Sequence, residues 1–312
     1  SMINRPNFFA ENGLDRADHH RRNFDWLRAR EADPDSRFVA VWRYRSLIIQ
    51  SELDDSLRAA FLPPEAAADL RGELPAIFLG LDQGGRAYFA LDISSHPLEE
   101  QETPELHGHG KFLDLRDMGQ LLPHQDGGIL ALARGLIFWH RKHRFCGVCG
   151  CPTEAINAGH QRRCCNQDCK TPQFPRTDPA VIMLVHDGAD RCVLGRHPSW
   201  AQGNMSTLAG FVEPGESLEE AVIREVYEEV GLRARNATYV SSQPWPFPSS
   251  LMLGYFAEAD FGPLTLQPDE IENARWFHRD EILNCPHDAH FKLPREISIA
   301  RRLIQTWVGQ DV

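Results

Sequence analysis

The chain has 312 residues, of which 42% are hydrophobic and 25% are charged, and its formal net charge at pH 7 is -11. This length and composition predict two or three folded domains, and the negative charge argues against a protein that coats DNA or RNA, although a local basic patch is compatible with it. The sequence has no apolar run of membrane-spanning length and no signal or transit peptide pattern, so we expect a cytoplasmic protein without membrane contact.

Residues 1–125 alternate strand-like and helix-like patterns, which predicts a small α+β domain. Residues 37–50, RFVAVWRYRSLIIQ, are rich in β-branched and aromatic side chains. In residues 76–94, Gln83-Gly84-Gly85 separates two apolar runs, a pattern typical of a β-hairpin. We interpret residues 107–110, HGHG, as a flexible loop rather than a metal site, and this region contains no other chemical motif.

Residues 126–143 place Ile129, Leu132 and Leu136 at helical spacing, which predicts an amphipathic helix that leads into a cluster of cysteines. Six of the eight cysteines lie between positions 146 and 169, and such clustering is typical of a metal site rather than of a secreted disulfide framework. The sequence offers Cys146 and Cys149 as one pair of ligands. The second pair is Cys169 with either Cys164 or Cys165, with Cys151 in reserve.

Four sulfur ligands fill all the positions of a tetrahedral zinc ion, so we expect a structural zinc that holds neighbouring domains together. Basic residues surround the cluster, and we interpret them as a solvated rim; the alternative is a binding surface for the polyanionic tail of an RNA. They are Arg141, Lys142, Arg144, Arg162, Arg163 and Lys170.

From position 179 onward, apolar runs alternate with helical patterns, which predicts a mixed sheet flanked by helices. Within this region, Ser217 and Glu220 form a capping box that begins a helix, and Gly231 ends it. Glu225, Glu228 and Glu229 share one face near the carboxyl end of this helix, where the helix dipole disfavours acids. A solvated acidic face is the alternative, but a divalent cation such as Mg²⁺ or Mn²⁺ explains three converging carboxylates better.

Residues 242–250, SQPWPFPSS, combine three alternating prolines with two aromatic rings. The prolines fix an extended backbone, which would present Trp245 and Phe247 beside Gln243 in a loop that could hold a flat ring. A ligand for a proline-binding domain and a rigid structural turn are the alternatives.

Together these residues carry a resemblance to a known family. The motif GX5EX7REVXEEXGL, which runs from Gly210 to Leu232, matches the Nudix box at its constrained positions, including Glu216 and Arg224. The resemblance implies a Nudix α/β/α sandwich and metal-assisted hydrolysis of a nucleoside diphosphate linked to another group. SQPWPFPSS is similar to the signature of the NADH pyrophosphatases among Nudix hydrolases, and the chain resembles that family throughout.

The resemblance also implies an order of domains. An N-terminal Nudix-like α+β domain would occupy residues 1–125, a linker helix and a zinc ribbon would occupy residues 126–176, and the catalytic Nudix domain would occupy residues 177–312. The fold class is therefore expected to be α+β / α/β. The C-x4-C spacing of Cys164 and Cys169 is similar to that of animal members, which favours Cys146, Cys149, Cys164 and Cys169 as the zinc ligands.

Roles for single residues follow from the same resemblance. It assigns Mg²⁺ or Mn²⁺ to Glu225, Glu229, Glu270 and the carbonyl of Ala209. Glu229 is the principal catalytic carboxylate, and Glu225 and Glu228 are the further catalytic residues. The predicted substrate-binding residues are Phe174, Phe211, Gln243, Pro244, Trp245, Pro246, Phe247, Pro248, Ser249, Ser250 and Ala300. For Phe174 and Phe211, packing in the core is the alternative.

The resemblance predicts cleavage of NADH or NAD⁺ to nicotinamide mononucleotide and AMP, and removal of NAD caps from RNA 5′ ends. Family members resembling this chain dimerise, so we expect a homodimer in which Phe174 of one chain and Phe211 of the other sandwich a substrate ring. The alternatives are a Nudix hydrolase of ADP-ribose or dinucleoside polyphosphates, and a non-catalytic module that senses NAD. We expect no DNA partner.

Overall fold

The structure is a computed structural model that describes residues 5–72, 74–98 and 104–309. Its contacts divide the chain into two units. The N-terminal unit comprises Phe8–Thr177 and Trp245–Ser249, and the C-terminal unit comprises Ser1–Asn7, Asp178–Pro244 and Ser250–Val312. The predicted boundaries at 125/126 and 176/177 stay predictions.

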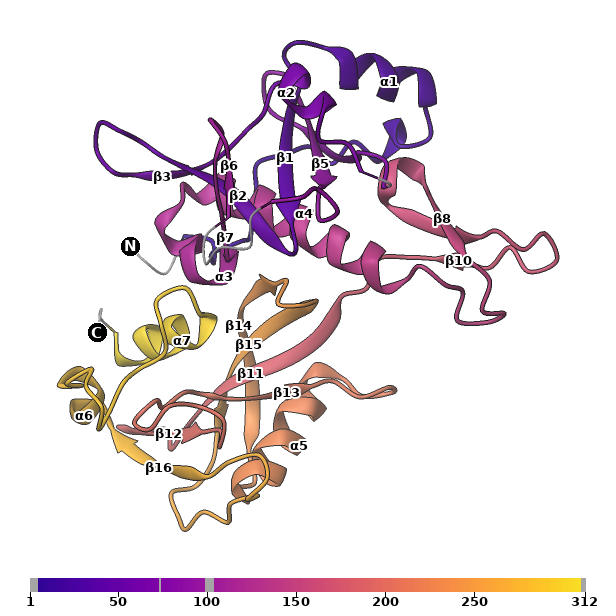
Figure 1. Cartoon of the computed structure of the whole chain (residues 1–312). Coiled ribbons are helices and arrows are strands. Elements are labelled where there is room, and N and C mark those ends of the chain that lie inside the picture. Colours follow the sequence, from indigo (N-terminus) through magenta and orange to yellow (C-terminus); the bar gives the residue numbers. More distant parts are fainter. Residues whose placement is uncertain (1–4, 73, 99–103, 310–312) are drawn as a thin grey trace. The chain divides into compact units, whose positions relative to one another are not determined.

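A seven-stranded mixed sheet forms the centre of the N-terminal unit, with the order β4-β5-β1-β2-β7-β6 and β3 paired with β2 (Figure 1). Its strands are β1 (Arg37–Trp42), β2 (Arg45–Gln50), β3 (Leu57–Ala59), β4 (Ile77–Leu81), β5 (Ala87–Asp92), β6 (Glu105–Leu106) and β7 (Gly110–Leu113). β4 and β5 pair antiparallel on either side of Gln83-Gly84-Gly85, which confirms the predicted hairpin. Residues 107–109 form the turn between β6 and β7.

Strand β1 is buried on both faces, so other elements must pack against both faces of its sheet. Phe38, Ala40 and Trp42 enter one core, to which Trp26 and Ala67 also belong. The intervening Val39 and Val41 are equally buried, and α4 packs against β1 to β4. The helical segments are η2 (Asp18–His20), α1 (Phe24–Ala32), α2 (Pro64–Ala68), α3 (Leu115–Met118), η3 (Gly119–Leu121) and α4 (His124–Lys142). The predicted helix at 126–143 is confirmed as α4.

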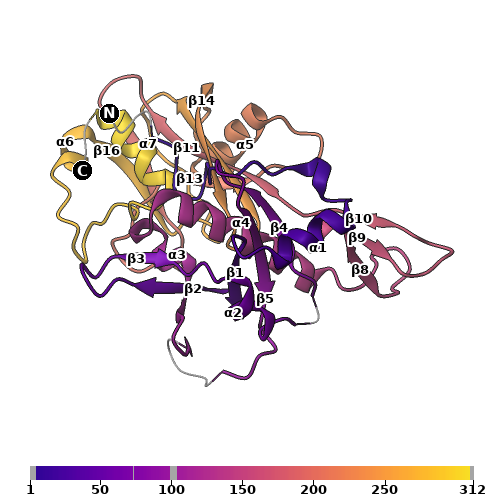
Figure 2. The same cartoon turned by 90° about the horizontal axis from the view of Figure 1, so that it is seen from above.

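A small three-stranded sheet follows α4 and stands out from the rest of the N-terminal unit in both views (Figures 1 and 2). It comprises β8 (Thr153–Ile156), β9 (Gln161–Cys164) and β10 (Pro172–Gln173), with η4 (Asn157–Gly159) between the first two strands. The turn at η4 lies close to β4, since a Cβ on Gly159, whose φ is +89°, would lie 2.8 Å from Ile77. His160 then bonds through Nε2 to the Phe78 carbonyl at 2.6 Å. This end of the small sheet is therefore fixed to the large one.

The C-terminal unit is a six-stranded mixed sheet between helices, in the order β14-β15-β11-β12-β16 with β13 paired with β11. Val181, Met183 and Val185 of β11 face the core under α5, whereas Ile182 and Leu184 face the core under α6 and α7. This alternation confirms the predicted α/β/α sandwich. The elements are β11 (Asp178–His186), β12 (Arg191–Arg196), β13 (Leu208–Phe211), α5 (Leu218–Val230), β14 (Arg235–Trp245), β15 (Ser250–Glu258), β16 (Asn273–His278), α6 (Arg279–Leu283) and α7 (Ile299–Val308).

Among the described residues, the helices are too short or too polar to cross a membrane.

Candidate active site and metal centres

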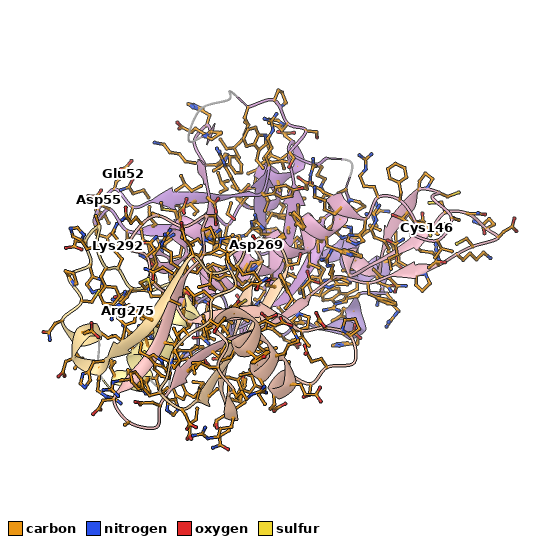
Figure 3. The ribbon with its side chains drawn as sticks, turned by 90° about the horizontal axis from the view of Figure 1, so that it is seen from below. Glu52, Asp55, Cys146, Asp269, Arg275 and Lys292 are labelled. Carbon is orange, nitrogen blue, oxygen red and sulfur yellow. The ribbon has the colours of Figure 1, made fainter. Side chains whose placement is uncertain are left out.

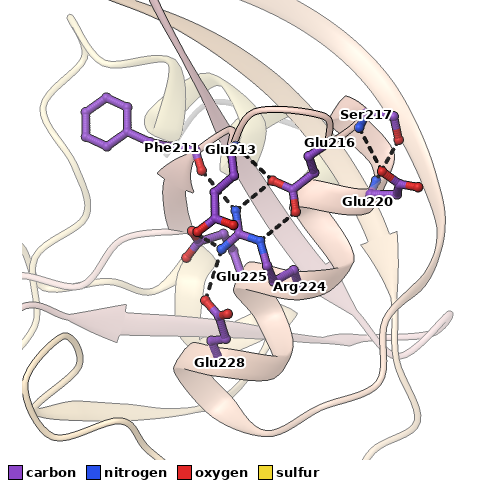
Figure 4. A network of polar contacts seen from close by, with 8 residues as sticks. All are labelled: Phe211, Glu213, Glu216, Ser217, Glu220, Arg224, Glu225 and Glu228. Atoms are coloured by element: carbon purple, nitrogen blue, oxygen red, sulfur yellow. Dashed lines mark hydrogen bonds and ion pairs between the residues drawn. The ribbon is translucent and has the colours of Figure 1, made fainter.

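Helix α5 begins and ends as its sequence predicts. The Ser217 hydroxyl accepts from the Glu220 backbone N–H at 3.2 Å, and the Glu220 carboxylate accepts from the Ser217 backbone N–H at 2.9 Å (Figure 4). Gly231 follows the last turn with φ 73°. Val222, Val226 and the other buried side chains of α5 fix it to the sheet, so its acidic face is held in one position.

Arg224 is the centre of a polar network on this helix (Figure 4). It donates to both oxygens of Glu216 at 2.6 and 2.8 Å, to Glu225 Oε1 at 2.8 Å, to Glu228 Oε2 at 3.0 Å and to the Phe211 carbonyl at 3.0 Å. These five bonds match the five N–H groups of a guanidinium. The bonds from Arg224 lower the pKa of Glu216 to about 2. Sequence reasoning placed Glu216 in the motif but gave it no role.

Three carboxylates meet beside this network. Oxygens of Glu225, Glu229 and Glu270 lie within 4.8 Å of one another. Burial, followed by the charges of Glu225 and Glu270, raises the pKa of Glu229 to about 8. Its Oε2 atom is buried and has no hydrogen-bond partner in the described part of the chain. Glu228 lies outside this group of three, half-exposed and bonded to Arg224.

The loop that carries Glu270 is attached to the end of α5. The backbone N–H of Thr265 donates to the Val230 carbonyl at 2.9 Å, and that of Gln267 donates to the Glu229 carbonyl at 3.1 Å. These bonds satisfy carbonyls that a helix end otherwise leaves free. Ile271 is buried in the core under α5. An acid 41 positions after Glu229 in the sequence is therefore held beside it.

The residues present fit a hard divalent cation. Three carboxylates supply only oxygen donors, which Mg²⁺ and Mn²⁺ prefer, and one buried oxygen has no other partner. Space for this group depends on Gly210 in β13, because a Cβ there would lie 2.0 Å from the Glu225 carboxyl carbon. Ala209, the predicted carbonyl ligand, precedes Gly210 in the same strand.

The residues of SQPWPFPSS divide between the two units. Trp245–Ser249 belongs to the N-terminal unit, while Gln243, Pro244 and Ser250 belong to the C-terminal unit. The Trp245 and Phe247 rings contact each other at 5.0 Å and both contact Phe9, at 6.1 and 5.5 Å. Arg134 donates to the Pro246 carbonyl and its guanidinium lies over Phe247. These rings thus have partners within the protein, which agrees with the rigid structural turn weighed as an alternative.

Gln243 and Ala300 are both buried in the C-terminal unit. The Gln243 amide donates to the Ile297 carbonyl at 2.8 Å and accepts from the Ile299 N–H at 2.9 Å, and its residue is 1% exposed. Ala300 follows in α7. Gln243 therefore joins β14 to the start of α7, and its predicted contact with substrate stays a prediction.

Phe174 and Phe211 are exposed, at 63% and 60%, so the alternative of core packing is wrong for both rings. Pro248 and Ser249 line a cavity of about 280 Å³ in the N-terminal unit. Lys142 and Arg176 also line it and supply positive charge. Two predicted substrate-binding residues therefore lie at this cavity.

The four predicted zinc ligands meet in the small sheet. Sulfur atoms of Cys146, Cys149, Cys164 and Cys169 lie within 4.8 Å of one another, with Cys146 to Cys169 at 3.9 Å and Cys149 to Cys164 at 3.4 Å (Figure 3 labels Cys146). Sulfurs of a tetrahedral zinc site with bonds of about 2.3 Å are separated by about 3.8 Å, so the cluster fits zinc. Cys165 is exposed and outside this group.

The basic residues around this cluster do not all form a solvated rim. Arg162 is 8% exposed, so that interpretation is wrong for it. Its side chain donates to Thr153 and His140. Period-two alternation in β9 places Arg162 on the same buried face as Cys164, a signal that the sequence already contained.

Two separate parts of the chain match known domain families. Residues 176–297 match the NUDIX domain, and residues 35–139 match the NADH pyrophosphatase-like rudimentary NUDIX domain. The chain is 33% identical to the human NAD-capped RNA hydrolase NUDT12 over 97% of this chain and 73% of that protein. It is 40% identical to the NAD-capped RNA hydrolase NudC of Mycobacterium tuberculosis over 78% of this chain and 79% of that one.

Among solved structures, a NUDIX hydrolase from Nitrosomonas europaea matches with a TM-score of 0.42 and 17% identity, covering 54% of this chain and 95% of that one. The family of the chain follows from two findings. Both domain models match it, and the two relatives align over most of its length. The chain belongs to the NADH pyrophosphatase-like family of Nudix hydrolases.

Proposed function

We propose that this protein hydrolyses the pyrophosphate bond of NADH or NAD⁺ to nicotinamide mononucleotide and AMP, and that it also removes NAD caps from RNA 5′ ends. Two relatives that align with most of the chain bear the name NAD-capped RNA hydrolase. The Nudix box and the SQPWPFPSS segment are both intact.

The observation that carries this proposal is the group formed by Glu225, Glu229 and Glu270. Three carboxylates beside one arginine are a costly arrangement in the absence of a ligand, because like charges repel and Glu229 is buried. A solvated acidic face, the alternative for this helix, does not account for a buried carboxylate oxygen without a partner. Strain of this kind is typical of a functional site.

A divalent cation held here would neutralise phosphate oxygens and lower the pKa of an attacking water. The chain's own residues hold and orient the reacting groups. Arg224 fixes Glu225 Oε1, and Gly210 leaves space for that carboxylate. We assign Glu229 Oε2 to accept a hydrogen bond from the water.

The cysteine cluster has a separate role in this proposal. Zinc bound by Cys146, Cys149, Cys164 and Cys169 would have four sulfur ligands and no open position, so it would be structural. We propose one zinc ion per chain, which fixes the loop before β8 to the end of β9.

The homodimer is likewise part of the proposal. The Phe174 and Phe211 rings are exposed in their own units, so both are available to stack on a ligand. Co-expression of a Glu229→Gln chain with a Phe174→Ala chain tests a shared pocket. Recovered activity in the mixed dimer is expected, whereas no recovery, or a monomer by light scattering, contradicts it.

A substrate panel distinguishes the proposed reaction from its alternatives. We expect the highest kcat/KM with NADH, NAD⁺ or NAD-capped RNA in the presence of Mg²⁺ or Mn²⁺. A higher value with ADP-ribose or a diadenosine polyphosphate would assign a different Nudix activity. Binding of NAD⁺ without turnover of any of these compounds would favour a sensing module.

A further inference from the structure

A second cavity, of about 620 Å³, lies wholly within the N-terminal unit and contains none of the predicted catalytic, metal-binding or NAD-binding residues, although three of the basic residues near the cysteine cluster line it. Its walls are formed by the turn after β5, by the end of α4 with the residues that follow it, and by strands β8 and β9. Its volume is in the range of small-molecule and cofactor sites.

The charged side chains of this cavity leave an excess of positive charge. They are Asp92, Arg141, Arg144, Glu154 and Arg162. Asp92 pairs with Arg141 at 3.3 Å, and Glu154 pairs with Arg163 at 2.8 Å. Within the described residues, Arg144 and Arg162 form no ion pair. Two cations therefore face the cavity without a carboxylate partner.

Arg162 is buried by neutral groups. It donates to the hydroxyl and the carbonyl of Thr153, both at 2.8 Å, and to His140 Nδ1 at 2.9 Å. His140 Nε2 lies 2.7 Å from the Gly159 carbonyl, so the ring donates there and accepts from Arg162 in its neutral form. These bonds use three of the five N–H groups of the guanidinium, which leaves two N–H groups for a ligand.

The mouth of the cavity offers a flat apolar surface. Phe145 lines it and is 60% exposed, and the Arg144 guanidinium lies 5.9 Å from the centre of the Phe145 ring. Pro75 and Pro152 also line the cavity, and Ser94 and Ser95 add hydroxyl groups. Exposed aromatic rings stack on nucleobases, and guanidinium groups bind phosphate through paired N–H donors.

We propose that this cavity is a second nucleotide-binding site, which takes a ligand with one phosphate and one flat ring. Arg144 and Arg162 would bind the phosphate, and Phe145 would stack on the base. The site belongs to the N-terminal unit alone, so it does not depend on the reaction proposed for the C-terminal unit.

Hydrogen exchange of the full-length, zinc-loaded protein tests this site, with AMP as the probe and no added Mg²⁺ or Mn²⁺. We expect AMP to slow exchange at least threefold in residues 141–165, and Arg144→Ala to weaken AMP binding at this location at least tenfold. Arg28→Ala is a matched control, because Arg28 also lies over an exposed ring, that of Phe24, at 5.5 Å. It should leave AMP binding unchanged.

Further probes identify the source of the phosphate. Adenosine and inorganic phosphate should each bind more weakly than AMP, since each lacks one half of the ligand. A short RNA that protects residues 141–165 more strongly than AMP assigns the site to RNA, and equal protection assigns it to free nucleotides. Protection confined to residues 210–232, or equal binding by the Arg144→Ala variant, would overturn the proposal. A protein that binds AMP in residues 141–165 but does not cleave NADH would refute the proposed reaction alone.

Discussion

Arg224 shows how one side chain can organise an acidic site. Its guanidinium joins Glu216, which precedes the helix, to Glu225 and Glu228 on the helix and to the Phe211 carbonyl. The spacing of the motif identifies these residues but does not show that the loop folds back onto the helix. The position of this loop depends on tertiary packing, which a sequence pattern does not show.

Arg224→Lys should therefore disable the site while keeping its charge. A lysine ammonium has three donors, so at least two of the five bonds are lost. We expect the free energy of unfolding to fall by about 1 to 3 kcal/mol, and kcat to fall at least tenfold. Urea unfolding and steady-state kinetics measure the two effects. A variant with wild-type values of both would contradict the role of the network.

Glu229 should couple divalent cations to stability. A ligand that binds the folded state alone raises stability, so 10 mM Mg²⁺ should raise the Tm of the wild-type protein by several degrees. Glu229→Gln should lose most of this increase because one ligand and one negative charge are removed. Glu219→Gln, an exposed change on the same helix, is the matched control and should keep the increase. Equal increases of the Tm in all three proteins would show that Glu229 does not bind the cation.

Among the elements, α5 could be predicted almost completely, because its two ends depend on local chemistry. Ser217, Glu220 and Gly231 act on neighbouring backbone groups, and the helix runs from Leu218 to Val230 as predicted. The contacts of the small sheet were harder to predict from the sequence. Four cysteines indicated a metal site, but the burial of Arg162 and His140 depends on contacts between α4 and β9.

The small sheet should depend on zinc. Purified protein is expected to contain about one zinc per chain, and Cys149→Ser should lower both the zinc content and the Tm. Cys165→Ser is the matched control, because Cys165 is exposed and outside the cluster. Elemental analysis and thermal unfolding measure both. Full zinc content in Cys149→Ser, or its loss in Cys165→Ser, would show a different ligand set.

Acid should weaken the contact between the small sheet and β4. Burial lowers the pKa of His160 to about 4, below its ordinary value of 6.5. The unfolded chain therefore binds a proton that the folded chain excludes between about pH 6.5 and pH 4, so this contribution is present above that window and lost as pH falls through it.

The loss of stability caused by protonation of His160 can be measured by comparing the wild-type protein with a variant that does not titrate. For one histidine it is at most about 3 kcal/mol. His160→Gln keeps a donor for the Phe78 carbonyl but does not titrate, so its urea midpoint should fall less than that of the wild-type protein between pH 7 and pH 5. Acid release of zinc is expected to lower the urea midpoint of both proteins equally, because His160 is not one of the four cysteine ligands. If the urea midpoints of both proteins fell by the same amount across this range, His160 would not be the cause of the loss of stability.

For the whole molecule, the sequence predicted more of the chemistry than of the supporting contacts. The Nudix box identified Glu225 and Glu229, whereas the attachment of the Glu270 loop to α5 through Thr265 and Gln267 follows only from the fold. The same holds for Gln243: the motif predicted substrate binding, which stays a prediction, and only the fold shows that its amide joins β14 to α7. Contacts of a motif residue within the protein depend on tertiary packing, which the sequence pattern does not give.

Product analysis tests the central claim, that Glu225, Glu229 and Glu270 hold the cation of an NAD(H) pyrophosphatase. NADH is incubated with Mn²⁺ and either the wild-type protein or the Glu229→Gln variant, and the products are measured by chromatography and mass spectrometry. We expect equal amounts of AMP and reduced nicotinamide mononucleotide from the wild-type protein, and kcat at least 100-fold lower for the variant. Intact NADH after incubation with the wild-type protein, or a variant that retains more than about a tenth of the wild-type kcat, would contradict the claim.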